Sequence, residues 1–193
     1  MKITTPIPPS HLAAAADLYW QAFGTKLGPV LGPRNKGLRF IESIQRPDHA
    51  LCAIGDDDRL LGVAGFKTIE GALVGGTFRD LARVYGIIGA TWRALLLAAL
   101  EQDTENERFL MDGLFVAPQA RGKGIGTALL DAICDEAHKR GYSQVRLDVI
   151  DTNPRAKALY QQVGFKPLKT TSIGPLRHIF GFHSTTTMVR DVG

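Results

Sequence analysis

The sequence predicts an α/β (α+β) fold in which a mixed, mostly antiparallel central sheet of about six to seven strands carries helices on both faces. Short apolar or alternating runs bounded by turn residues predict the strands. Apolar residues spaced three and four apart, between start and stop residues, predict the helices. The chain has 193 residues, 45% of them hydrophobic and 22% charged, so we expect a single domain over 1–193.

The first part of the chain predicts two helices followed by a hairpin. Ser10 can cap a helix that runs to about Phe23, and a loop rich in Gly and Pro over 24–33 separates it from a helix near 35–45. Two strands, 49–54 and 60–69, are joined through three consecutive aspartates, which indicates a hairpin.

Residues 71–107 break this pattern, with clustered glycines and then an apolar helix ending near Gln102. We interpret 71–107 as a helical insertion between the third and fourth strands. The run 84–100 is too apolar to stand alone in water, so it covers a substrate pocket, forms a homodimer face or adds core. Because it contains Arg93 and falls short of ~20 clean apolar residues, we expect no membrane span.

The second part begins with the predicted central strand, 109–116. A helix over 124–140 follows, and Gly141 ends it as a left-handed cap. Alternating apolar residues then predict the next strand, and they are Val145, Leu147 and Val149.

A short helix and two strands complete the chain. Asn153 is the predicted N-cap of the helix, Pro154 its first residue and Gly164 its stop. Runs 165–173 and 183–189 predict closing antiparallel strands.

A glycine-rich loop lies between the central strand and the helix after it. Its residues are Arg121, Gly122, Lys123, Gly124, Ile125, Gly126 and Thr127. The N–H groups at a helix start have no helical acceptor, and the helix dipole adds roughly half a positive charge there. The loop therefore predicts a site for a phosphate or diphosphate.

Two other types of phosphate loop fit less well. A P-loop needs Gly, four residues and then Gly-Lys-Ser/Thr, whereas Gly124 follows Lys123 here and no Gly stands at the earlier position. A dinucleotide fingerprint needs G-x-G-x-x-G, and Thr127 replaces its third glycine. Asp148 does lie near the distance of that fingerprint's acidic residue, which keeps this motif as an alternative. The missing third glycine makes it the weaker one.

The loop resembles the signature R/Q-x-x-G-x-G/A of the GNAT superfamily of acyl-coenzyme A-dependent N-acyltransferases, which lies between a strand and a helix. A second block at the expected spacing supports the resemblance: Asn153, Ala156, Leu159, Tyr160, Gly164 and Phe165. The detailed similarity covers about 111–167. It implies a GNAT-like fold and acetyl-coenzyme A as cosubstrate.

The resemblance also implies where the cosubstrate binds. The pantetheine arm would lie beside the splayed central strand, on backbone groups of Leu114, Phe115 and Val116. The diphosphate would lie on the amides of 121–127, with charge from Arg121 and Lys123. Asn153 would contact the arm, and Tyr160 would donate a proton to the departing thiolate.

The same resemblance implies direct attack of a primary amine on the thioester. An alkyl ammonium has a pKa near 10.4, so at pH 7 only about one molecule in 2,500 is the neutral nucleophile. Many family members carry an acidic residue where this chain has Asp112, which would be the base. Alternation places Asp112 on one face with Leu114 and Val116. Asp148 and Glu70 are competing candidates.

The acceptor stays open among small molecules and peptides. The strand 112–116 is similar to that of aminoglycoside 6′-N-acetyltransferases, but no acidic patch suited to a polycation is evident. Polyamines, amino acids and protein N-termini are further candidates. A coenzyme A-binding sensor or partner module without catalysis is the alternative function.

Composition also predicts the protein's partners, its cellular location and whether it binds a metal. A net charge of +4 without clustered Lys and Arg among aromatics indicates no nucleic-acid partner. Two cysteines and no apolar signal core predict buried, reduced thiols in a cytoplasmic protein. We expect no metal site and surface positions for four histidines without metal spacing: His49, His138, His178 and His183.

Overall fold

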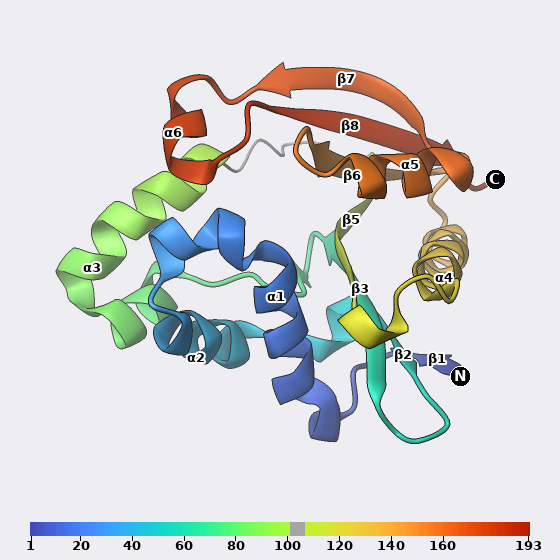
Figure 1. Cartoon of the computed structure of the whole chain (residues 1–193), viewed down its shortest axis with the longest axis horizontal. Coiled ribbons are helices and arrows are strands. Elements are labelled where there is room, and N and C mark those ends of the chain that lie inside the picture. Colours follow the sequence, from blue (N-terminus) through green and yellow to red (C-terminus); the bar gives the residue numbers. More distant parts are fainter. Residues whose placement is uncertain (101–106) are drawn as a thin grey trace.

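The computed structural model describes residues 1–100 and 107–193 (Figure 1). Over these residues the strands form one mixed sheet in the order β1-β2-β3-β5-β6-β8-β7, with β4 paired to β3. The strands are β1 (Lys2–Thr4), β2 (Ala50–Ile54), β3 (Leu60–Thr68), β4 (Gly71–Ala72), β5 (Phe109–Val116), β6 (Gln144–Ile150), β7 (Lys166–Ser172) and β8 (Ser184–Asp191). The helices are α1 (Leu12–Leu31), α2 (Arg34–Ile44), α3 (Phe78–Leu100), α4 (Ile125–Lys139), α5 (Pro154–Gln162) and α6 (Arg177–Phe180).

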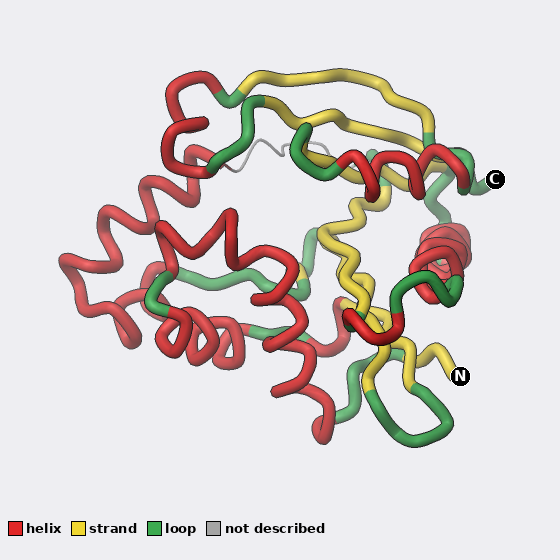
Figure 2. The backbone as a smooth tube through the Cα atoms, in the orientation of Figure 1, coloured by secondary structure: helices red, strands yellow, loops and turns green. Residues whose placement is uncertain are grey.

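The predicted fold class is confirmed. Pairing is antiparallel along the sheet except between β5 and β6, which run parallel. Helices cover both faces: α4 packs on β2, β3, β5 and β6, and α1 packs on β3 and β5 (Figure 2). The sequence interpretation did not include β1, which pairs with the edge of the predicted hairpin.

Local end signals of the helices are also confirmed. Gly141 follows α4 with a φ of 82°, the left-handed conformation that a glycine adopts without steric cost. At α5, the Asn153 side chain accepts a hydrogen bond from the Ala156 N–H at 3.2 Å, and Pro154 is the first helical residue.

Both cysteines, Cys52 and Cys134, are buried and form no disulfide.

The first helix differs from its prediction at both ends. Ser10 lies in a short 3-10 turn before α1, where its Oγ bonds His11 Nδ1 at 3.0 Å instead of capping. The expected loop over 24–33 is mostly helix, since α1 continues to Leu31. Tertiary packing accompanies this longer helix: a Cβ on Gly37 of α2 would collide with the Trp20 ring at 2.1 Å, and Val30 and Leu31 are buried in one core with Phe40.

The insertion contains the predicted apolar helix as α3, while its expected end near Gln102 lies outside the described residues. Gly86 interrupts α3 with a φ of 72°. Leu81 and Ala90 pack in a core with Phe180 and Phe182, whereas Ile87 and Ile88 are 73% and 87% exposed. By length and composition alone, 78–98 is long and apolar enough to cross a membrane, but one such helix is weak evidence for a membrane span. A homodimer face on α3 stays a prediction.

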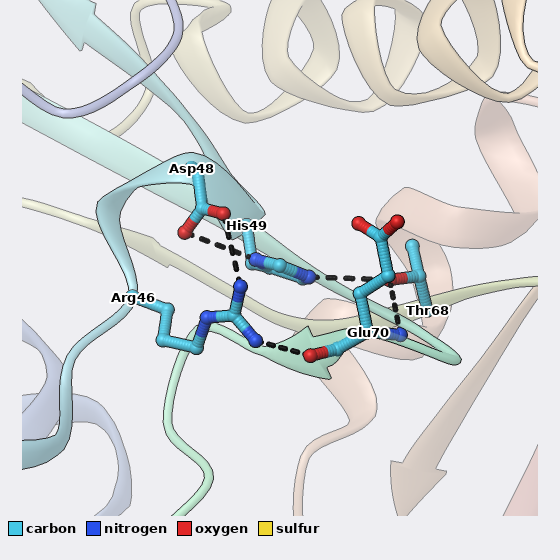
Figure 3. A network of polar contacts seen from close by, with 5 residues as sticks. All are labelled: Arg46, Asp48, His49, Thr68 and Glu70. Carbon is cyan, nitrogen blue, oxygen red and sulfur yellow. Dashed lines mark hydrogen bonds and ion pairs between the residues drawn. The ribbon is translucent and has the colours of Figure 1, made fainter.

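One predicted surface histidine, His49, is in fact only 2% exposed. Figure 3 shows its polar contacts. Its Nε2 lies 3.1 Å from Thr68 Oγ1, and its Nδ1 lies 3.1 Å from a carboxylate oxygen of Asp48. The Glu70 N–H donates to Thr68 Oγ1, so the Thr68 hydroxyl proton is available to His49 Nε2. Arg46 bonds both Asp48 and the Glu70 carbonyl. These contacts fasten the end of β3 to the turn before β2.

Thr68→Val should lower the free energy of unfolding by about 1–3 kcal/mol, because it removes a partner of a buried imidazole nitrogen. Urea unfolding measures the change. Thr4→Val, in another strand, is the control and should stay within about 0.5 kcal/mol of the wild type. Equal loss in the two variants would contradict the role assigned to Thr68.

Candidate active site

The parallel strands β5 and β6 separate partway along their length. Their pairing joins Phe109–Met111 to 145–147 and stops there, while β5 continues along β3 as far as Val116. Figure 1 shows β6, β8 and β7 turning away from the lower part of β5. A gap therefore opens in the middle of the sheet beside residues 112–116.

Backbone groups of β5 face this gap. The Ala117 N–H donates to the Leu61 carbonyl at 2.8 Å, so the backbone N–H of Ala117 points toward β3. The direction of the backbone N–H and C=O groups alternates along a strand. Those of Phe115 therefore also point toward β3, whereas those of Leu114 and Val116 point toward the gap. Arg121 Nε donates to the Val116 carbonyl from that side at 3.2 Å.

The glycine-rich loop ends at an open helix terminus. Gly124 is the N-cap of α4 with a φ of 77°, and Gly122 has a φ of 75°. The first helical bond runs from the Ala128 N–H to the Gly124 carbonyl at 3.0 Å, so the N–H groups of 125–127 lie at the helix start. A Cβ on Gly126 would lie 3.2 Å from Leu159, which shows how closely α4 approaches α5.

A cavity of about 690 Å³, here called the loop cavity, lies between this loop, β5, α5 and α1. Its lining includes every residue expected to bind the cosubstrate except Lys123: Leu114, Phe115, Val116, Arg121, Gly122, Gly124, Ile125, Gly126, Thr127, Asn153 and Tyr160. Leu18, Gln21 and Arg155 also line it and were missed. Arg155 follows Pro154 directly and adds a second cation to the lining of the cavity, besides Arg121.

A second cavity of about 540 Å³, the sheet cavity, lies over the face of the sheet on which α1 packs. Leu114, Asn153 and Tyr160 line both cavities, together with Ala22 of α1. The two spaces therefore meet at the gap between β5 and β6. The described residues 78–98 of α3 line neither cavity, so the expected pocket cover is not provided by this part of the insertion.

The expectation that Asp112 shares a face with Leu114 and Val116 is wrong. Gly65 pairs with Gly113 and Phe66 with Met111, so Asp112 is the extra residue of a β-bulge. After the bulge the faces are exchanged: a Cβ on Gly113 would meet Phe23 of α1, whereas Leu114 and Val116 lie beside Gly126. Asp112 lines the sheet cavity, on the side of α1.

Of the candidate bases, Asp112 and Asp148 line the sheet cavity, and Glu70 lies in the network around His49 instead. Arg146 Nη2 contacts Asp148 at 3.1 Å, and the Thr187 hydroxyl donates to the same carboxylate. Asp112 acts on two groups of α1: burial chiefly raises the pKa of Tyr19, and the Asp112 charge raises it further. Burial lowers the pKa of Lys26, against the opposing effect of both aspartates.

Tyr160 lies where the cavities meet and is 7% exposed. Its burial raises the pKa of the phenol to about 12, so the hydroxyl stays protonated near neutral pH and can donate a proton. Within 1–100 and 107–193, no group of three His, Cys, Asp or Glu is arranged to hold a metal ion.

A family profile described as "Acetyltransferase (GNAT) family" matches residues 12–165, which is most of the chain. The chain belongs to this GNAT acetyltransferase family. A crystal structure of an N-acetyltransferase from Staphylococcus aureus Mu50 superposes with a TM-score of 0.66 over 98% of this chain and 100% of that one. At 15% identity, this similarity supports the GNAT fold alone.

Curated relatives match shorter segments. Streptothricin acetyltransferase of Streptomyces lavendulae is 33% identical over 84 residues, 44% of each chain. Thialysine N-epsilon-acetyltransferase of Mus musculus is 40% identical over 58 residues, 30% of this chain and 34% of the relative. The matches thus span less than half the length of these two relatives.

Proposed function

We propose that this GNAT protein transfers an acetyl group from acetyl-coenzyme A to a primary amine by direct attack on the thioester. The observation that carries the proposal is the meeting of the loop cavity and the sheet cavity at Leu114, Asn153 and Tyr160. A thioester held in one cavity would there face an amine held in the other.

The cosubstrate fits the polar groups of the loop cavity. The diphosphate would accept hydrogen bonds from the N–H groups of 125–127, with Arg121, Lys123 and Arg155 supplying positive charge. The pantetheine arm would lie along the gap on the backbone of Leu114 and Val116, as an added strand would. Phe115 would line the cavity, but its backbone groups would not bond the arm.

The acid and the base would act from opposite sides of the thioester. Asp112 would take the proton of the ammonium group, directly or through water, and the neutral amine would attack the carbonyl carbon. Tyr160 would donate its proton to the departing sulfur. The names of the two relatives fit an acceptor with a primary amine on a small molecule, since one is named for the Nε of thialysine and the other for streptothricin.

Gly122→Asp tests the anion site with a matched control. Asp and Asn both tolerate a positive φ better than other residues, and a Cβ at Gly122 would meet nothing within 4 Å. We expect Gly122→Asp to weaken acetyl-coenzyme A binding at least about 10-fold through charge repulsion, while Gly122→Asn stays within about threefold. Isothermal titration calorimetry measures both.

Thiol release against a panel of primary amines then tests turnover. No binding of acetyl-coenzyme A by the folded wild-type chain would overturn the proposal. Binding without thiol release from any amine would favour the sensor or partner module.

A further inference from the structure

The helix α1 runs across both cavities of the candidate site. Leu18 lines the loop cavity, Lys26 lines the sheet cavity, and Ala22 lines both. Each is four residues from the next, so the three side chains follow one another along one face of the helix. A helical turn rises about 5.4 Å, so Ala22 lies at the junction of the cavities with one neighbour about a turn to either side.

Ala22 contributes the smallest side chain to this junction. Among the described residues, the others that line both cavities are Leu114, Asn153 and Tyr160. Tyr160 is buried, whereas Ala22 is exposed, so the methyl group of Ala22 borders open space. The room left at the junction therefore lies on the side of α1.

Aromatic packing holds α1 against β5 beside this junction. Phe23, the residue after Ala22, lies so close to Gly113 that a Cβ on this glycine would be 3.0 Å from the ring. Phe115 packs on the rings of Tyr19 and Phe23 with centroid distances of 5.7 and 6.1 Å. Close-packed contacts of this kind resist displacement of the helix. A larger side chain at residue 22 would therefore fill the junction rather than push α1 away.

We infer that Ala22 determines how large an acyl group the site accepts, and that the site takes acyl groups longer than acetyl; this rests on the proposed function. With the sulfur in the loop cavity and the amine in the sheet cavity, the carbonyl carbon lies at the junction. Its alkyl substituent points away from both, into the room beside Ala22. Transfer balances as for acetyl: the carbonyl carbon gains a bond to nitrogen and loses its bond to sulfur, one ammonium proton ends on the sulfur, and another leaves to solvent.

Calorimetry with butyryl-coenzyme A and coenzyme A tests the inference on the full chain. In the wild type, the dissociation constants of these two ligands should lie within about 10-fold of each other. Ala22→Leu adds an isopropyl group at the junction. It should raise the ratio of the butyryl-coenzyme A constant to the coenzyme A constant at least about 10-fold, because a single methylene group in an apolar pocket can already change discrimination by about that factor. The ratio of kcat/KM for acetyl transfer to that for butyryl transfer should rise by a similar factor.

Ala14→Leu is the matched control, since Ala14 is also exposed on α1 but lines neither cavity, and both ratios should stay within about twofold of the wild type. Ala22→Met is read in the same way if Ala22→Leu does not fold. Unchanged ratios in the folded variant, or a wild type that transfers acetyl but binds butyryl-coenzyme A more than about 10-fold more weakly than coenzyme A, would overturn the inference and leave the acetyltransferase in place. No binding of acetyl-coenzyme A by the folded wild type would overturn both.

Discussion

Tyr160→Phe should lower kcat by about 10²-fold or more while the dissociation constant of acetyl-coenzyme A stays within about twofold. The substitution removes the hydroxyl and keeps the ring, which is buried and packs on Phe165 with a centroid distance of 6.1 Å. The fold and the loop cavity are therefore retained. The variant would lack the proton donor that we propose for the departing sulfur.

Rapid-quench turnover and calorimetry separate the two quantities, and Tyr142→Phe is the matched control. Tyr142 packs on Phe109 at 5.4 Å, outside the lining of both cavities, so its variant should keep wild-type turnover. Burial raises the pKa of Tyr160 to about 12, so a donor that must be protonated is lost only as the pH approaches that value. A fall in kcat near pH 9 that Tyr160→Phe abolishes would contradict this assignment.

The parts of the fold that depend on local backbone chemistry could be predicted from the sequence. Gly141 and Asn153 each end or begin a helix through their own conformation or side chain, so their neighbours in sequence suffice to identify them. The length of α1 depends instead on Trp20 lying against Gly37 of another helix. Packing of this kind leaves no signal in a single segment, and it overrode the expected loop.

The site shows the same division. The open helix terminus after Gly124 is a local feature and could be predicted. The bulge at Asp112 arises from how β5 pairs with β3, and periodicity alone placed this carboxylate on the wrong face. The cations of the sheet cavity were missed because Lys26, Lys67 and Lys169 come from three elements far apart in sequence, and Lys26 lies in the unpredicted part of α1.

Asp112→Asn should lower kcat/KM for an amine acceptor by about 10²-fold at pH 7, with binding of acetyl-coenzyme A unchanged. The variant keeps the size of the side chain at the bulge and removes the carboxylate that we propose as the proton acceptor. Neutral amine must then come from solution, where its fraction rises tenfold per pH unit below a pKa near 10.4. The defect should therefore shrink as the pH is raised from 7 to 10.

Asp148→Asn distinguishes the neighbouring carboxylate. Arg146 and Thr187 already hold Asp148, so its variant should change KM more than kcat and should keep the pH dependence of the wild type. Stopped-flow detection of the released thiol across this pH range compares the three proteins. An unchanged pH profile in Asp112→Asn, with a lost acidic limb in Asp148→Asn, would transfer the role of base to Asp148, because both carboxylates line the sheet cavity.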